Sequence, residues 1–118
     1  MSARHALRGV GAAWRTESNF RIEIVAFALV LLLAGMARVA PWEWIAIFLV
    51  SGMVLVVELL NSAVERLLDL LKPRLHGYAR DVKDVMAGAT FLVSVCAAVV
   101  GFVIFLPRLL ALLHLDGA

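Results

Sequence analysis

The sequence predicts an all-α membrane protein, with an N-terminal amphipathic surface helix followed by three transmembrane helices in a single domain spanning residues 1–118. Three observations predict this fold class. Apolar residues make up 64% of the chain and charged residues 17%, whereas soluble domains are usually about 45–50% apolar. The charged residues divide the chain into long apolar segments, and a short amphipathic segment precedes the first of them.

The amphipathic segment covers residues 3–16. At 100° per residue, Leu7, Val10 and Trp14 fall on one face of a helix, and arginines such as Arg8 and Arg15 fall on a face beside it. A helix with this pattern suits the headgroup layer of a bilayer, where its apolar face is buried and its arginines can meet phosphate groups. We therefore expect a helix that lies on the membrane surface.

The three expected membrane spans cover residues 20–39, 43–71 and 81–106. Fourteen uncharged residues precede Arg38 in the first span, and flanking charged side chains that reach for the interface complete its length. The second span begins beside Trp42 and Trp44, which suit an aromatic belt, and its helical pattern continues past Glu58. The third span contains twenty-two consecutive uncharged residues, about 33 Å of helix. Only this last segment is long enough by itself to cross a bilayer.

The distribution of basic residues predicts the orientation. Four arginines lie before or at the start of the first span and four basic residues lie in the 72–84 loop, whereas the turn at 38–43 and the C-terminal tail carry one arginine each. The positive-inside rule then places the N-terminus and the 72–84 loop in the cytoplasm. We expect a multi-pass protein whose tail faces outward.

Charge and cysteine content exclude other classes of protein. The net charge of +2 is too small to form an electrostatic footprint for nucleic acid, so we expect no nucleic-acid partner. Cys96 is the only cysteine, so the chain has no internal disulfide framework, and we expect Cys96 to be a buried, inert thiol. A chain of this size encloses little by itself, and an active site would need neighbouring copies of it.

Residues 58–72 carry the polar side chains that point to chemistry. On a helical wheel they occupy one arc of about 140°, and all other residues of the segment are apolar. The polar set is Glu58, Asn61, Ser62, Glu65, Arg66, Asp69 and Lys72. A helix that leaves the membrane with its polar face in water would explain most of this set. It explains Glu58 poorly, because thirteen uncharged residues precede that acid and an unpartnered charge within the bilayer costs about 2.5–3.5 kcal/mol on insertion scales.

The spacing of the acids suggests two chemical tasks. Glu58 and Glu65 lie on the same face, about 10.5 Å apart along a helix, with Asn61 between them. This separation suits one carboxylate that accepts a proton and another that holds a divalent cation, for which hard carboxylate oxygens favour Mg²⁺. Glu17 could supply a further oxygen from the same side of the membrane. The chain contains no phosphate-binding loop of the G-x-x-x-x-G-K-[ST] type and no kinase glycine-rich loop.

The run Glu58-Leu59-Leu60-Asn61-Ser62-Ala63-Val64-Glu65 resembles the signature of the prokaryotic diacylglycerol kinase family. Asp69, the pair Lys83-Asp84 and the segment Arg15-Thr16-Glu17-Ser18-Asn19-Phe20-Arg21 also resemble that family. The resemblance covers nearly the whole chain. It implies a homotrimer of three-span chains in the bacterial inner (cytoplasmic) membrane. It also implies that MgATP is used to phosphorylate a lipid hydroxyl at the cytoplasmic boundary.

The resemblance also implies roles for individual residues. Glu58 is expected to be the general base, and Glu17 and Glu65 are expected to hold the magnesium ion bound to ATP. The other expected ATP-site residues are Asn61, Arg74, His76, Lys83 and Asp84. The acceptor is either diacylglycerol, giving phosphatidic acid, or undecaprenol, giving undecaprenyl phosphate. The T-E-S-N-F segment at 16–20 and the F-L-P segment at 105–107 look more like the undecaprenol branch of the family.

Two other functions remain open at this point. In the first, the chain is a non-enzymatic small membrane subunit, in which Glu58 and Asn61 hold helices together through a structural polar interface. In the second, the acids form a path for protons or ions. The first thirteen residues of the apolar segment before Glu58 contain no ionisable group, so an ion path would not cross the bilayer. Neither alternative predicts consumption of ATP.

Overall fold

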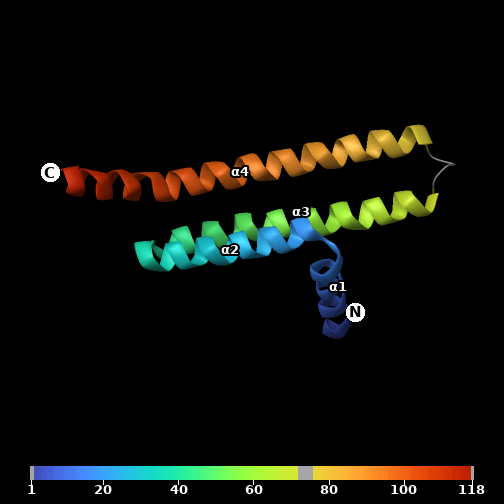
Figure 1. Ribbon diagram of the computed structural model, residues 1–118, viewed down its shortest axis with the longest axis horizontal. Helices are drawn as coiled ribbons and strands as arrows, with labels where there is room; N and C mark the ends of the chain where they lie inside the picture. Colours follow the sequence, from blue (N-terminus) through green and yellow to red (C-terminus); the bar gives the residue numbers. More distant parts are fainter. Residues whose placement is uncertain (1, 72–75, 118) are drawn as a thin grey trace.

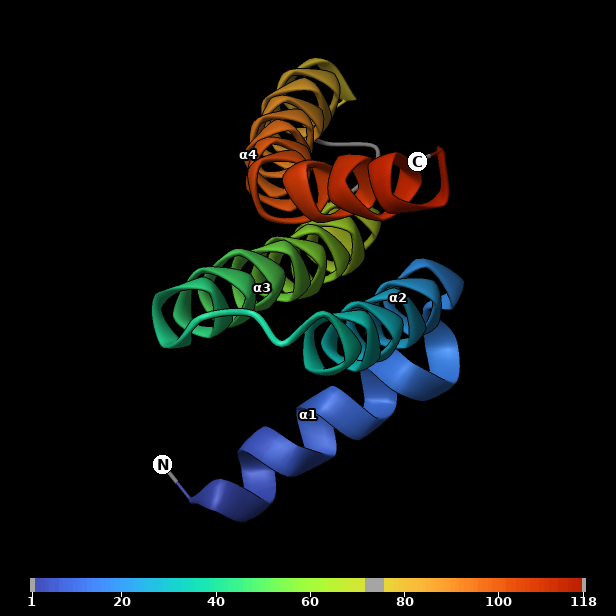
Figure 2. The same ribbon diagram turned by 90° about the vertical axis from the view of Figure 1, so that its left-hand side faces the viewer.

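The computed structural model describes residues 2–71 and 76–117, with side chains described for residues 2–71 and 77–114. These described residues form four successive helices: α1 (Ala3–Thr16), α2 (Ser18–Ala37), α3 (Pro41–Leu71) and α4 (His76–Gly117). Helices α2, α3 and α4 run side by side, and α1 projects away from them (Figure 1). In the end-on view of Figure 2, α3 lies between α2 and α4, with which it makes most of the contacts between helices.

The predicted fold class is confirmed. The described residues include three helices that are long and apolar enough to cross a membrane, at Ser18–Ala37, Pro41–Leu71 and Gly77–His114. Large hydrophobic side chains on these helices face outward: Leu32 is 61% exposed and Phe102 is 66% exposed in the isolated chain. A surface of this kind is stable against lipid or against further copies of the chain, but not against water.

The surface helix α1 has the bounds that its amphipathic pattern predicts. The Ser2 side chain caps its start by accepting a hydrogen bond from the backbone N–H of His5 at 3.4 Å. The helix ends because Glu17 is extended, with φ −115° and ψ 107°. Arg21, in the first turns of α2, donates from Nη1 to the carbonyl oxygens of Trp14 at 2.7 Å and Arg15 at 3.2 Å. These bonds satisfy carbonyls at the end of α1 and fix the direction in which it leaves α2.

The turn between α2 and α3 is built from local capping. Arg38 adopts the left-handed conformation, with φ 53°, and its N–H bonds back to the last turn of α2. Pro41 then takes the first position of α3, where its missing N–H costs nothing. The Glu43 carboxylate accepts a hydrogen bond from the N–H of Ala40 at 2.8 Å, as in a capping box. The turn therefore reverses the chain within a few residues.

Helix α4 continues beyond the span expected from the sequence. It passes through Pro107, which we took as the end of the third apolar segment, and reaches Gly117. In a membrane helix, neighbouring groups can satisfy the carbonyl that a proline leaves free. Cys96 corrects a second expectation, because its side chain is exposed on α4 in the isolated chain rather than buried. The apolar run around Cys96 indicated burial in a bilayer, and it could not distinguish a lipid-facing position from a protein core.

An ion pair joins α3 and α4 at the end of the bundle remote from α1. Arg108 donates from Nη2 to Oε1 of Glu43 at 2.6 Å and from Nη1 to Oε2 at 2.8 Å, a bidentate arrangement. The Glu43 side chain is only 7% exposed. A small apolar cluster of Ala34, Val39, Ile47 and Ile104 lies at the same end. This end of the molecule is thus the better packed one.

Removing Arg108 should lower the thermal stability of the protein. In Arg108→Ala the buried Glu43 carboxylate loses both of its arginine hydrogen bonds, and an unpaired buried charge is strongly unfavourable. Arg108→Lys should lose less, since it keeps the charge but not the planar fork. Thermal unfolding in detergent, followed by circular dichroism, checks this. The control is Arg38→Asn, which removes one positive charge from the same end at an exposed left-handed position. Equal stability of Arg108→Ala and wild type would show that the pair is not structural.

Candidate active site

Glu58 is the most deeply placed acid of the polar face on α3. The residue is 6% exposed, and its carboxylate interacts electrostatically with those of Glu17 and Glu65. Glu65 follows two turns later on α3, and Glu17 belongs to the extended link between α1 and α2. The fold therefore brings together three acids that the sequence separates by up to 48 positions. Glu58 does not point into bulk water.

Glu23 is a fourth acid, and our sequence analysis gave it no functional role. It lies on α2, its carboxylate interacts electrostatically with that of Glu58, and its Oε2 is buried without a hydrogen-bond partner among the described residues. It also borders a cavity of about 130 Å³, together with Phe27 and Ser51. The sequence does contain a feature that could have indicated a role for Glu23. It directly precedes an uninterrupted apolar run, just as Glu58 directly follows one.

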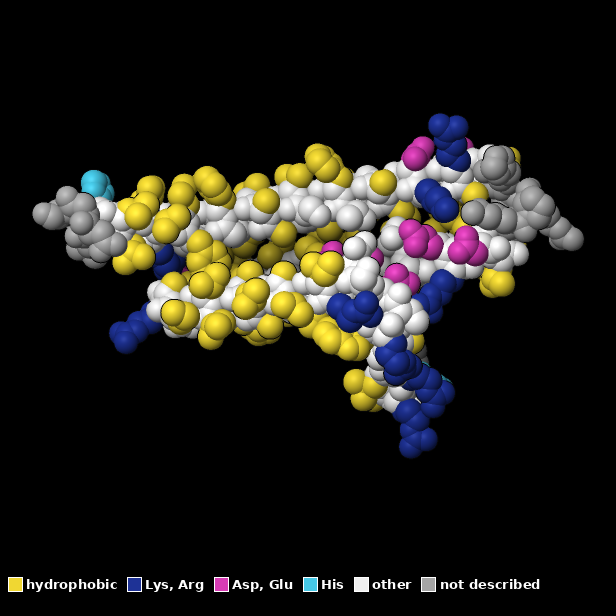
Figure 3. All heavy atoms as spheres, in the orientation of Figure 1, with side chains coloured by type: hydrophobic (Ala, Val, Ile, Leu, Met, Phe, Trp, Pro, Cys, Tyr) yellow, Lys and Arg dark blue, Asp and Glu magenta, His cyan; other side chains and the backbone are white. Residues whose placement is uncertain are grey.

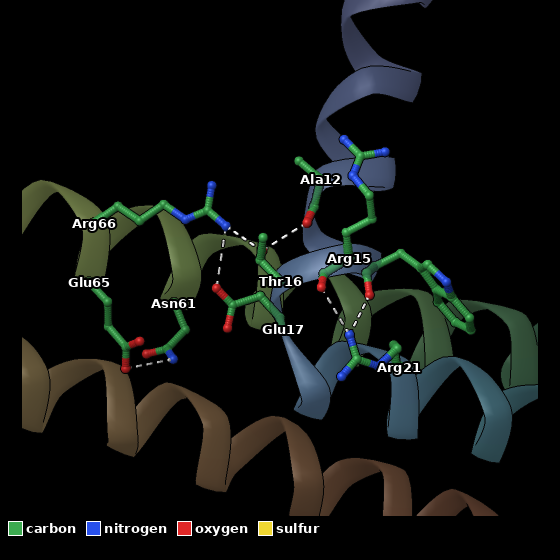
Figure 4. A network of polar contacts seen from close by, with 9 residues as sticks. Ala12, Arg15, Thr16, Glu17, Arg21, Asn61, Glu65 and Arg66 are labelled. Atoms are coloured by element: carbon green, nitrogen blue, oxygen red, sulfur yellow. Dashed lines mark hydrogen bonds and ion pairs between the residues drawn. The ribbon is translucent and has the colours of Figure 1, made fainter.

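Asn61 and Glu65 form a pair on α3. The Asn61 amide nitrogen Nδ2 donates to Oε1 of Glu65 at 3.3 Å, across one turn of the helix. Figure 4 shows the two side chains turned toward each other. This bond fixes the direction of one Glu65 oxygen and leaves the other free for a further interaction. Asn61 thus positions an acid that the sequence analysis assigned to metal binding.

Arg66 connects α3 to the link between α1 and α2. Its Nη2 donates to Oγ1 of Thr16 at 2.7 Å and to Oε1 of Glu17 at 3.4 Å (Figure 4). The Thr16 hydroxyl in turn donates to the carbonyl oxygen of Ala12 at 2.8 Å. The network therefore holds Glu17 beside α3. The helical wheel placed Arg66 on the polar face but gave no indication of these partners.

The remaining expected site residues lie around the start of α4. Lys83 and Asp84 are exposed on its first turns, at the end of the bundle where α3 finishes. Arg74 lies outside the described residues. His76 opens α4, but its side chain also lies outside them. Charged side chains gather at this end of the molecule, next to α1, and hydrophobic side chains cover most of the rest of the visible face (Figure 3).

The donor set fits a magnesium ion that is shared with a phosphate ligand. Within the described residues, no group of three or more His, Cys, Asp or Glu side chains could hold a metal ion by itself. Mg²⁺ is commonly bound by one or two carboxylates together with substrate phosphates and water. Glu17 and Glu65, which both interact electrostatically with Glu58, are carboxylates of that kind. An ion here would arrive with its ligand rather than reside in a closed protein site.

These features define a class of protein: a polytopic helical membrane protein whose acidic site lies where apolar surface gives way to charge. The chain belongs to the prokaryotic diacylglycerol kinase family, which it matches over residues 4–105. It is therefore a lipid kinase, and membership of a kinase family implies the use of ATP. This finding sets aside the non-enzymatic subunit and the ion path.

Several characterised relatives are similar over most of the chain. The undecaprenol kinase of Bacillus subtilis is 38% identical over 105 residues, covering 89% of this chain and 85% of that protein. The diacylglycerol kinase of Synechocystis is 35% identical over 114 residues, covering 96% of this chain and 65% of that protein. The diacylglycerol kinase of Escherichia coli is 31% identical over 105 residues, with coverage of 89% and 85%. The relatives thus include kinases named for two different lipids.

Proposed function

We propose that this lipid kinase transfers the γ-phosphoryl group of ATP to the hydroxyl of a lipid that stays in the membrane. The bond between the γ-phosphorus and the bridging oxygen of ADP breaks, a bond from the lipid oxygen to that phosphorus forms, and ADP leaves. The observation that carries the proposal is the position of Glu58, buried at the edge of the apolar segment and in the same cluster as Glu17 and Glu65. Few residues are needed, because phosphoryl transfer depends mainly on positioning and charge neutralisation.

In this reaction Glu58 is the general base. The lipid hydroxyl approaches from the membrane side, and Glu58 accepts its proton as the oxygen attacks phosphorus. A buried carboxylate suits this task because water is excluded around it, which keeps the proton transfer between the two reacting groups. Glu23, whose Oε2 is buried and whose carboxylate interacts electrostatically with that of Glu58, borders the small cavity. The region around the base is therefore lined from two helices, α2 and α3.

Glu17 and Glu65 would hold Mg²⁺, and Asn61 would orient Glu65 through the bond between them. When bound, the ion would neutralise charge on the phosphate oxygens. The proposed contacts to the nucleotide are Asn61 on α3, Lys83 and Asp84 on α4, and Arg74 and His76, which follow α3 along the sequence. The lipid-facing and nucleotide-facing groups then meet along one polar face of α3.

Orientation and assembly follow from the same arrangement. We place the N-terminus and the 72–84 loop in the cytoplasm, because the basic residues concentrate there and ATP is cytoplasmic. We also infer a homotrimer. The isolated chain leaves side chains such as Phe91 (67% exposed) and Phe102 (66% exposed) on the open faces of α4. Packing against neighbouring copies would cover such faces and close a site that one chain leaves open.

Of the two candidate acceptors we favour undecaprenol over diacylglycerol. The identity to the undecaprenol kinase of Bacillus subtilis, 38%, exceeds that to the diacylglycerol kinases of Synechocystis and Escherichia coli, 35% and 31%. The motifs at 16–20 and 105–107 agree with this choice. The apolar side chains near the site do not help to choose between the two acceptors, because such side chains discriminate weakly between lipid tails.

A competition assay tests both the activity and the acceptor. Purified protein is given undecaprenol and diacylglycerol in equal amounts in mixed micelles, with Mg²⁺ and γ-labelled ATP, and the labelled lipids are separated. We expect label mainly in undecaprenyl phosphate. Label mainly in phosphatidic acid would support the lipid kinase activity and contradict the choice of acceptor. No label in either lipid, with protein that is folded and binds nucleotide, would contradict the proposed reaction.

A further inference from the structure

The contacts of Arg66 suggest a role beyond holding helices together. Its guanidinium forms an ion pair with Glu17, one of the acids that interact with Glu58, through Nη2 to Oε1. The Arg66 side chain is 55% exposed and that of Glu17 is 27% exposed. Exposed ion pairs of this kind contribute little to stability, because solvent screens them. The pair is therefore easily exchanged for a stronger one.

Charge balance explains why an exchange is needed. Four carboxylates, those of Glu17, Glu23, Glu58 and Glu65, lie in one cluster, and a nucleotide brings a further polyanion into their neighbourhood. Mg²⁺ offsets part of that charge, but the phosphate oxygens also need donors from the protein. If Glu17 gives its oxygen to the metal, Arg66 loses that partner at the moment when phosphate arrives beside it.

We propose that Arg66 is a phosphate-binding residue of this kinase, which moves from Glu17 to the polyphosphate of the nucleotide when Glu17 binds the metal. The inference rests on the function proposed above. An arginine suits this exchange, because its planar fork binds phosphate oxygens in pairs and its charge is permanent. The described contacts use only Nη2, and in Figure 4 the other terminal nitrogen turns away from Thr16 and Glu17. The bond to Thr16 keeps the side chain near the cluster during the exchange.

The experiment measures nucleotide binding rather than turnover. Wild type, Arg66→Ala and Arg66→Lys are purified in a nonionic detergent, and binding of a non-hydrolysable MgATP analogue is measured by calorimetry without acceptor lipid. A hydrogen bond to a charged group contributes about 1.5–3 kcal/mol, so Arg66→Ala should weaken binding about tenfold to hundredfold. Arg66→Lys should lie between wild type and Arg66→Ala, since it keeps a point charge.

The control is Arg4→Ala, which removes the same charge from α1 twelve residues before Thr16. This variant should bind the analogue as wild type does. If Arg66→Ala and wild type bind equally well, Arg66 is only a structural tie and the proposal is overturned. Should Arg66→Ala fail to fold, as judged by circular dichroism, Arg66→Lys carries the test, and wild-type affinity in that variant would overturn the proposal, which requires the planar fork.

Two further arms separate this proposal from neighbouring ones. Repeating the titration in vesicles containing phosphatidylglycerol distinguishes a lipid headgroup phosphate from the nucleotide. A defect confined to those vesicles would assign Arg66 to lipid and overturn the nucleotide assignment. If wild type itself binds no MgATP analogue, the proposed function fails. If wild type binds it and the Arg66 variants bind equally, only the Arg66 proposal fails.

Discussion

Glu58→Gln should abolish lipid-dependent phosphoryl transfer while leaving nucleotide binding and assembly intact. Glutamine has nearly the same shape as glutamate and can still accept a hydrogen bond, but it cannot accept the proton of the lipid hydroxyl. General base catalysis contributes about 10²–10⁴-fold to a rate, so turnover should fall by at least two orders of magnitude. The measurement is transfer of label from γ-labelled ATP to lipid at saturating concentrations of both substrates.

The matched control for Glu58→Gln is Ser62→Ala. Ser62 lies one turn further along α3, is also buried at 6% exposure and has no assigned role. This variant should keep most of its turnover. Binding of a MgATP analogue and the elution volume of Glu58→Gln should match those of wild type, because the substitution leaves the nucleotide side of the cluster unchanged. Substantial turnover by Glu58→Gln would assign the base to another residue, and Glu23 would be the first alternative.

Much of the fold could be predicted because its determinants are local. The amphipathic period of residues 3–16 and the first two apolar runs fix α1, α2 and α3, whose observed bounds lie close to the expected ones, whereas α4 extends past both ends of its expected span. The polar face of α3 also follows from the helical period alone. The depth of Glu58 follows from the same pattern, because a long uncharged run precedes it. These features depend on composition and spacing, which a sequence displays directly.

The pairings between helices could not be predicted, because they depend on how each helix is rotated about its axis. Glu43 and Arg108 are 65 residues apart, and Arg66 and Thr16 are 50 apart. Each of the two arginines could have paired with several acids elsewhere in the chain. The electrostatic interaction of Glu23 with Glu58 has the same origin, since it requires that α2 turn this side toward α3. The sequence also does not show that α4 continues through Pro107, because neighbouring groups can satisfy the backbone that a proline leaves free in a membrane helix.

Glu65→Gln should raise the Mg²⁺ concentration that is needed for half-maximal activity. The substitution neutralises one of the two carboxylates proposed to bind the ion and keeps the shape of the side chain. If the lost interaction is comparable to a charged hydrogen bond, about 1.5–3 kcal/mol, the requirement should rise about tenfold to hundredfold. The measurement is the initial rate as a function of the free Mg²⁺ concentration, at a fixed and saturating total concentration of ATP.

A graded comparison separates metal binding from general damage to the site. Asn61→Ala keeps the Glu65 carboxylate but removes the hydrogen bond that orients it, 3.3 Å long in the structure, together with the proposed contact of Asn61 to the nucleotide. It should raise the Mg²⁺ requirement less than Glu65→Gln does. Asp81→Asn removes an acid from α4 at the same end of the bundle and should leave the requirement unchanged. At high Mg²⁺, Glu65→Gln should recover part of its rate, because mass action compensates for weak binding. A lower maximal rate with an unchanged Mg²⁺ requirement would instead place Glu65 among the groups that position the nucleotide.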